Sequence, residues 1–127
     1  MHNILIVDDS STIRKIIIRC ISHSQIAVGT LFEAADGEEA LKILRQESIH
    51  LVMTDINMPR MNGLELLSTL KSEEQWKNLP VLLITTEGRE DTVLEAASKG
   101  AAGYVKKPFT AGDIQAKIEP LLAGMPA

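Results

Sequence analysis

Three short and almost uninterrupted apolar runs constrain the fold of this 127-residue chain more than any other feature. They are Ile4–Val7, Leu51–Thr54 and Val81–Thr85. Short runs of this kind are typical of strands that are buried on both faces, as in a parallel sheet covered by helices. Thr30–Ala34 and Gly103–Val105 are weaker candidates for two further strands. Together the five segments predict one parallel sheet.

Amphipathic segments between these runs predict the helices. From Ile13 to Ile21, apolar residues recur at the spacing of one helix face. Two polar pairs have the spacing of a capping box that opens a helix. These pairs are Asp36 with Glu39 and Asn62 with Glu65. Gly100 is the expected stop of a helix over Val93–Lys99, and Thr110 is the expected N-cap of the last helix.

The alternation of strand and helix along the chain defines the fold class. Connections between parallel strands are right-handed, so the helices are expected to cover both faces of the sheet. We therefore expect a doubly wound α/β domain with a five-stranded parallel sheet over residues 1–127. Pro120 conflicts locally with this pattern, and we expect a kink or an early end of the last helix near Glu119.

Composition and charge exclude several classes of protein. With 13 basic and 17 acidic residues, the chain has a net charge of −4 and lacks the basic surface that nucleic acids require. The single cysteine, Cys20, cannot form an internal disulfide, which suits a reducing compartment. The amino-terminal segment lacks the features of a signal peptide, and no stretch is apolar enough to span a membrane. We therefore expect a soluble, cytoplasmic protein.

Polar and charged side chains follow four of the predicted strands. Ligands bind at the carboxyl ends of the strands in open α/β sheets, so these side chains are expected to meet at one edge. They are Asp8 and Asp9 after the first strand, Asp55 after the third, Thr85 at the end of the fourth, and Lys106 and Lys107 after the fifth. The sequence thus predicts a site that combines three carboxylates with a hydroxyl and an ammonium group.

Crowded carboxylates favour a bound cation. Each carboxylate raises the pKa of its neighbours, and a hard divalent cation such as Mg²⁺ relieves the repulsion by taking oxygen ligands. An aspartate can also accept a phosphoryl group covalently, while a cation and a lysine neutralise the charge on the transferring group.

Each of these signals has a plainer structural explanation when it is taken alone. Asp8 and Asp9 can form a helix cap or a turn, and Asp55 can simply open a loop. Thr85 can be the end of a buried strand, and Lys107 can be an ordinary solvated lysine. Their occurrence at the ends of consecutive buried strands favours a shared site.

The pattern resembles the receiver domains of two-component response regulators, and among them the single-domain chemotaxis (CheY-like) type. The segments that carry the resemblance cover nearly the whole chain and read ILIVDDSSTIRK, AADGEEAL, LVMTDINMPRMNGLELL, PVLLITTEG and GAAGYVKKPFT. The resemblance implies a flavodoxin-like (βα)5 fold, with the strand order 2-1-3-4-5 that is known for this protein type.

The resemblance also implies a role for each matched acidic position. Asp8 and Asp9 match the pair that holds Mg²⁺, or Mn²⁺ in its place, and Asp55 matches the phosphoacceptor, which is a further metal ligand. Asn57 matches the position whose backbone carbonyl binds the metal. Together with Glu87, it also matches the polar pair beside the water that hydrolyses the acyl phosphate.

Three further positions match the switching residues of the family. Thr85 matches the switch hydroxyl, and Tyr104 matches the aromatic residue that changes position on activation. Lys107 rather than Lys106 matches the lysine of the site, because it directly precedes Pro108. The family often has a cis peptide bond at that place, so the Lys107–Pro108 bond is expected to be cis.

By this resemblance the chain is a phosphorylation-activated switch and not a conventional enzyme. A histidine kinase would donate a phosphoryl group to Asp55, and the response would reach the surface of the fourth helix, fifth strand and fifth helix. Self-phosphorylation and self-dephosphorylation would be its only chemistry. The implied output partner is a protein, such as a flagellar switch, and not nucleic acid or a membrane. A monomer is expected.

Three alternatives remain open. The chain could be a receiver domain cut from a longer response regulator. It could be a Mg²⁺-dependent phosphohydrolase of the haloacid-dehalogenase kind, although that class needs a D-x-D spacing after the first strand, where Asp8 and Asp9 are adjacent. It could also be a degenerate receiver that acts without phosphate, although all the matched positions are filled.

Overall fold

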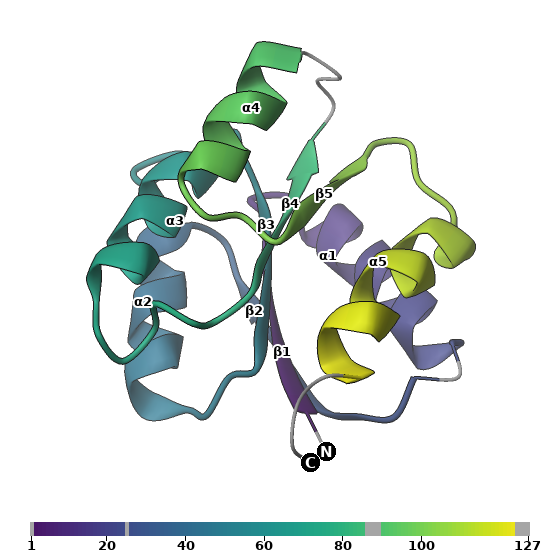
Figure 1. The fold of residues 1–127 in the computed structure, drawn as a ribbon. Coiled ribbons are helices and arrows are strands. Elements are labelled where there is room, and N and C mark those ends of the chain that lie inside the picture. The colour runs from purple at the N-terminus through teal and green to yellow at the C-terminus, as the bar shows by residue number, and fades with distance from the viewer. Residues whose placement is uncertain (1, 25, 86–89, 124–127) are drawn as a thin grey trace.

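A computed structural model describes residues 2–24, 26–85 and 90–123, in which five strands alternate with five helices (Figure 1). The strands are β1 (His2–Val7), β2 (Val28–Ala34), β3 (Leu51–Asp55), β4 (Val81–Thr85) and β5 (Gly103–Lys106). The helices are α1 (Ser11–Ser22), α2 (Gly37–Gln46), α3 (Gly63–Ser72), α4 (Glu90–Ser98) and α5 (Ala111–Ala123). Each expected strand and helix is therefore present.

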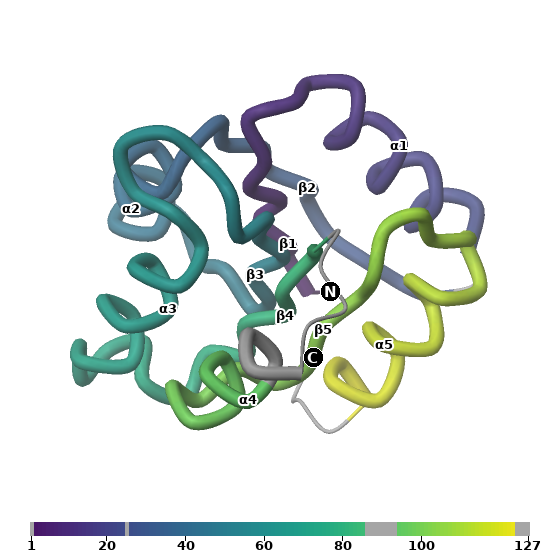
Figure 2. The backbone as a smooth tube through the Cα atoms, turned by 90° about the horizontal axis from the view of Figure 1, so that it is seen from above, coloured from purple at the N-terminus to yellow at the C-terminus, as the bar shows by residue number. Residues whose placement is uncertain are grey.

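The strands form one parallel sheet in the order β2-β1-β3-β4-β5. This order confirms the flavodoxin-like, doubly wound fold. The helices α1 and α5 cover one face, and α2, α3 and α4 lie along the other, as the view from above shows (Figure 2). Both faces of the sheet are therefore buried.

Consecutive residues of the central strands pack into different cores. Ile4 and Ile6 of β1 pack with α1 and α5, whereas Leu5 and Val7 pack with α2 and α3. All four of these side chains are fully buried. Since each face needs an apolar side chain at every second position, a strand covered on both sides is apolar without interruption. Cys20 is half-buried against the core beneath α1.

Side chains at the helix starts satisfy the free backbone N–H groups there. Asn62 and Glu65 form the complete capping box of α3. Asp36 caps α2 by accepting from the Glu39 N–H. Thr110 accepts from the Asp113 N–H at the start of α5, and the Asp113 carboxylate accepts from the Thr110 N–H in return. Gly100 follows α4 with a φ of 97°, in the left-handed region that ends helices.

Of the two expectations for Pro120, a kink or an early end of the last helix near Glu119, the early end is wrong. Helix α5 continues through Pro120 to Ala123. Ile118 and Leu122 are buried on either side of the proline, so packing against the sheet holds the last turn in place. Pro120 cannot donate to the Ala116 carbonyl, but Ala116 is exposed and its carbonyl can bond water instead.

Within the described ranges, no helix is both long and apolar enough to cross a lipid bilayer.

Candidate functional site

The parallel register brings four strand ends to the same level. Asp8 directly follows β1, Asp55 and Thr85 end β3 and β4, and Lys107 directly follows β5. Val7 pairs with Thr54, the residue before Asp55, and Thr85 pairs with Lys106, the residue before Lys107. The four side chains therefore meet at the carboxyl edge of the sheet, as the sequence predicts.

Asp8, Asp9 and Asp55 form a compact acidic cluster. Each offers a carboxylate oxygen, and the three oxygens lie within 4.8 Å of one another. Asp8 and Asp55 are buried, with 1% and 7% of their surface exposed, whereas Asp9 is exposed. The cluster therefore has two buried carboxylates and one side open to solvent.

Lys107 is the cation that faces this cluster. Its ammonium nitrogen lies 3.3 Å from Asp8 Oδ2 and 3.6 Å from Asp55 Oδ1. Burial and the charge of Asp8 raise the pKa of Asp55, while Lys107 and the Ile56 N–H partly oppose that effect. One lysine beside three carboxylates leaves excess negative charge, which a hard divalent cation with oxygen ligands would neutralise. The residues present thus fit such an ion.

Asp8 makes hydrogen bonds through its backbone N–H, its backbone carbonyl and its side chain. Its N–H donates to the Ala34 carbonyl at 3.0 Å, and its Oδ1 accepts from the Ser10 N–H at 2.9 Å. The Arg14 guanidinium donates to the Asp8 carbonyl at 2.6 Å and to Glu33 at 2.9 Å. Arg14 could not be identified from the sequence, because a lysine or arginine on a helix is usually solvated and the pattern does not indicate its partner.

A sharp turn begins directly after Asp55. The Gly63 N–H donates to the Ile56 carbonyl at 2.9 Å, which closes the loop between β3 and α3. A Cβ atom at Gly63 would collide with the Asp55 carbonyl oxygen, so only glycine fits there. Asn57 lies exposed in this loop, two residues beyond Asp55.

The remaining matched residues lie on β4 and β5. Thr85 is 2% exposed, and its carbonyl accepts from the Lys107 N–H at 2.7 Å. The Lys107–Pro108 peptide bond is cis, as predicted. Tyr104 is 38% exposed, and Lys106 is exposed at the end of β5. Glu87 lies outside the described residues.

Comparisons with known proteins place the chain in one family. The sequence model of the family described as the response regulator receiver domain matches residues 4–119. The chain belongs to the response regulator receiver family. Chemotaxis protein CheY of Pseudomonas aeruginosa is 44% identical over 119 residues, which cover 91% of this chain and 92% of that protein. Chemotaxis protein CheY-3 of Vibrio cholerae is 41% identical over 116 residues, with coverage of 91% and 88%.

Solved receiver structures have the same fold. Chemotaxis response regulator CheY4 of Vibrio cholerae superimposes with a TM-score of 0.86 at 31% identity, over 96% of this chain and 99% of that one. A receiver domain protein of Clostridium thermocellum gives 0.85 at 29% identity, over 97% and 95%. Receiver domains are phosphorylation-activated switches of two-component systems, and this receiver is one of them. Membership of the receiver family argues against the alternative of a haloacid-dehalogenase-type phosphohydrolase.

The raised pKa of Asp55 makes the stability of the metal-free receiver depend on pH. The folded state holds the Asp55 proton more tightly than the unfolded chain, so stability falls as the pH rises above the ordinary value of 3.8. Asp55→Asn removes the buried charge but keeps an acceptor for the Ile56 N–H. We expect it to raise the free energy of unfolding at pH 7 by about 1 kcal/mol.

Thermal unfolding in chelator, at pH 7 and at about pH 4, measures this effect. The advantage of Asp55→Asn should shrink at the lower pH, which lies close to the ordinary pKa of 3.8, because the Asp55 carboxyl is then increasingly protonated in both the folded and the unfolded chain. A variant that is less stable than the original protein at pH 7 would contradict the electrostatic account.

Proposed function

We propose that this receiver accepts a phosphoryl group on Asp55, with Mg²⁺ held by Asp8, Asp9, Asp55 and the backbone carbonyl of Asn57. The observation that supports this proposal is the buried Asp55 carboxylate between two further carboxylates and Lys107. When bound, the cation, Mg²⁺ or Mn²⁺, would neutralise charge on the transferring phosphoryl oxygens. The chemistry then depends on Asp55 as nucleophile.

In the proposed transfer, a carboxylate oxygen of Asp55 attacks the phosphorus of a phosphohistidine on the kinase. The phosphorus–nitrogen bond breaks, the leaving imidazole takes up a proton, and an acyl phosphate forms on Asp55. Lys107 lies close enough to Asp55 Oδ1 to pair with the phosphoryl group. Thr85, at the end of the adjacent strand, supplies the hydroxyl that turns toward the phosphoryl group.

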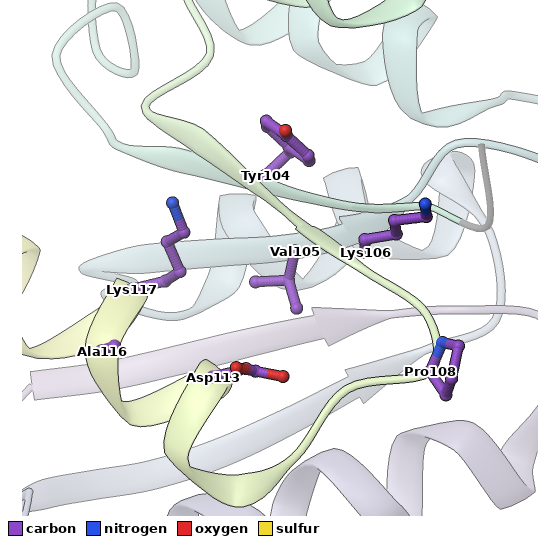
Figure 3. Close-up of a pocket in the computed structure, with 7 residues that line it drawn as sticks. All are labelled: Tyr104, Val105, Lys106, Pro108, Asp113, Ala116 and Lys117. Atoms are coloured by element: carbon purple, nitrogen blue, oxygen red, sulfur yellow. The ribbon is translucent and has the colours of Figure 1, made fainter. Parts of the chain in front are cut away.

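The proposed output surface is formed by α4, β5 and α5. Tyr104 and Lys106 extend from β5 at the rim of a hollow whose other rim carries Asp113 and Lys117 of α5 (Figure 3). The Lys117 ammonium lies 5.8 Å from the centre of the Tyr104 ring. Since Thr85 pairs with Lys106 in the sheet, a movement at the phosphorylated site reaches this surface within one strand.

The proposed partners are a histidine kinase and a downstream protein target. The CheY proteins named above carry chemotaxis in their names, which supports a chemotaxis output such as the flagellar switch. We further propose that residues 1–127 act as one cytoplasmic, monomeric domain. It would have no enzymatic turnover beyond the gain and loss of its own phosphoryl group.

A phosphoryl mimic tests whether the switch reaches this surface. With Mg²⁺ and beryllofluoride, we expect the largest backbone chemical-shift changes outside the site at Tyr104, Lys106 and the facing turns of α5. The Asp55→Asn protein, treated in the same way, is the control and should not show these chemical-shift changes. A downstream target that prefers the activated state by about 2 kcal/mol would bind that state roughly thirtyfold more tightly. Changes confined to α1 and α2 would show that the proposed output surface is wrong.

A further inference from the structure

A fourth carboxylate lies at the same edge of the sheet but outside the acidic cluster. Asp36 follows β2 and is 1% exposed. Its Oδ1 accepts from the Glu39 N–H at 2.9 Å, and its Oδ2 accepts from Nε of Arg60, also at 2.9 Å, and from Nη2. These partners lower the pKa of Asp36, against the effect of its burial. Its charge is thus fully engaged within the protein.

Arg60 reaches Asp36 from an unfavourable backbone conformation. Its φ is 64°, and it is the only residue other than glycine with a positive φ among the described residues. A glycine would adopt this conformation without strain, whereas a side chain with a Cβ atom does so at a cost. Strain of this kind persists where the surrounding structure holds it, and it often marks functional loops.

Further contacts fasten the same loop to the start of α2. The Gly37 N–H donates to the Met61 carbonyl at 3.3 Å. A Cβ atom at Gly37 would lie 2.6 Å from the Met61 side chain, so the methionine packs directly on the first residue of α2. Figure 2 shows the segment between β3 and α3 passing over the start of α2. Arg60 and Met61 therefore attach the loop, which begins at Asp55, to a second element of the fold.

We propose that Arg60 is a positioning residue for the metal, because its bond to Asp36 holds the loop that carries the Asn57 carbonyl. This inference rests on the proposed function, in which that carbonyl is a metal ligand. Arg60 does not touch the metal, since its guanidinium is bound to Asp36. By pairing with Asp36, Arg60 neutralises a carboxylate outside the cluster, while Asp8, Asp9 and Asp55 keep an excess of negative charge beside Lys107 among the described residues.

The sign of the effect on Mg²⁺ separates positioning from simple electrostatics. Arg60→Gly removes a positive charge near the site, so Coulomb attraction alone would make Mg²⁺ bind more tightly. If Arg60 positions the loop, the same substitution weakens Mg²⁺ binding, by about tenfold. Glycine also relieves the strained φ, which offsets the lost contact in the metal-free protein. We therefore expect little change in the thermal unfolding temperature without metal.

The experiment measures Mg²⁺ affinity by calorimetric titration and amide hydrogen exchange in chelator. In Arg60→Gly we expect the Gly37 and Gly63 amides to exchange faster, because both close the loop. Arg60→Lys keeps the charge and should restore part of the affinity. Arg45→Gln removes an exposed arginine charge from the far end of α2 and serves as the matched control.

The outcomes separate this inference from the proposed function. Arg60→Gly that binds Mg²⁺ as tightly as the original protein, or more tightly, with unchanged amide exchange, would overturn the positioning role alone. An original protein that binds no Mg²⁺ would overturn the proposed metal site, and the role of Arg60 with it.

Discussion

A receiver in which Asp9 is replaced with alanine will bind Mg²⁺ on the order of a hundredfold more weakly than the original protein. Asp9 is exposed, so its removal leaves the core intact, but it supplies one of three carboxylate oxygens that lie within 4.8 Å of one another. Substitution of Asp8 would be less informative, because Asp8 also accepts from the Ser10 N–H and pairs with Lys107. Titration of the metal-free protein with Mg²⁺ measures the loss.

Metal-free stability provides a second measure of the Asp9→Ala protein. The charge of Asp9 contributes to the raised pKa of Asp55, so its removal should leave the metal-free fold unchanged or slightly more stable. Glu74→Ala makes the same change in net charge at an exposed position, where Glu74 pairs only with the neighbouring Lys77 among the contacts described. Equal Mg²⁺ affinity in the Asp9→Ala and original proteins would refute the proposed ligand set.

Asp55→Asn is expected to abolish phosphorylation, with a loss of labelling of at least about a hundredfold. An amide is not a nucleophile toward phosphorus, although it keeps the shape of the side chain. Asp8 is a poor substitute because hydrogen bonds and Lys107 hold both its oxygens. Asp9 is also a poor substitute, because it lies at the exposed side of the cluster and not in the buried position of Asp55. Intact-mass measurement after incubation with acetyl phosphate and Mg²⁺ measures the loss.

The sheet and the strand-end cluster could be predicted from the sequence for one physical reason. A strand buried on both faces is apolar at most positions, because a buried polar side chain needs a partner, as Thr54 has in the Asp55 carbonyl. The first charged residue after such a run therefore marks its carboxyl end. Asp8 and Asp55 stand at that point. Parallel pairing then brings such ends together whatever the intervening helices contain.

The contacts that hold the loops of the site could not be predicted in the same way. Arg60 and Asp36 are separated by 24 residues, and their pairing depends on the path of the loop after Asp55. The pairing of Arg14 with Glu33 likewise depends on how α1 packs beside β2. Charged residues fit equally well in solvent, so hydrophobic periodicity contains no information about such partners.

Pro120 shows that tertiary packing can outweigh a local signal. The sequence predicts a disturbed helix because proline removes one hydrogen bond. The buried side chains of Ile118 and Leu122 lie before and after it, and their packing continues the helix to Ala123. Local propensity contains no information about that packing.

The site of phosphorylation tests the central claim most directly. The experiment compares the original protein with Asp55→Asn and Asp9→Ala after incubation with acetyl phosphate and Mg²⁺. Borohydride then reduces the acyl phosphate to a stable product. Digestion and mass spectrometry identify the modified residue. We expect the original protein to be modified at Asp55, Asp9→Ala to be modified weakly at the same residue, and Asp55→Asn to be unmodified. Modification of Asp55→Asn at the level of the original protein, or no modification of the original protein at Asp55, would contradict the account.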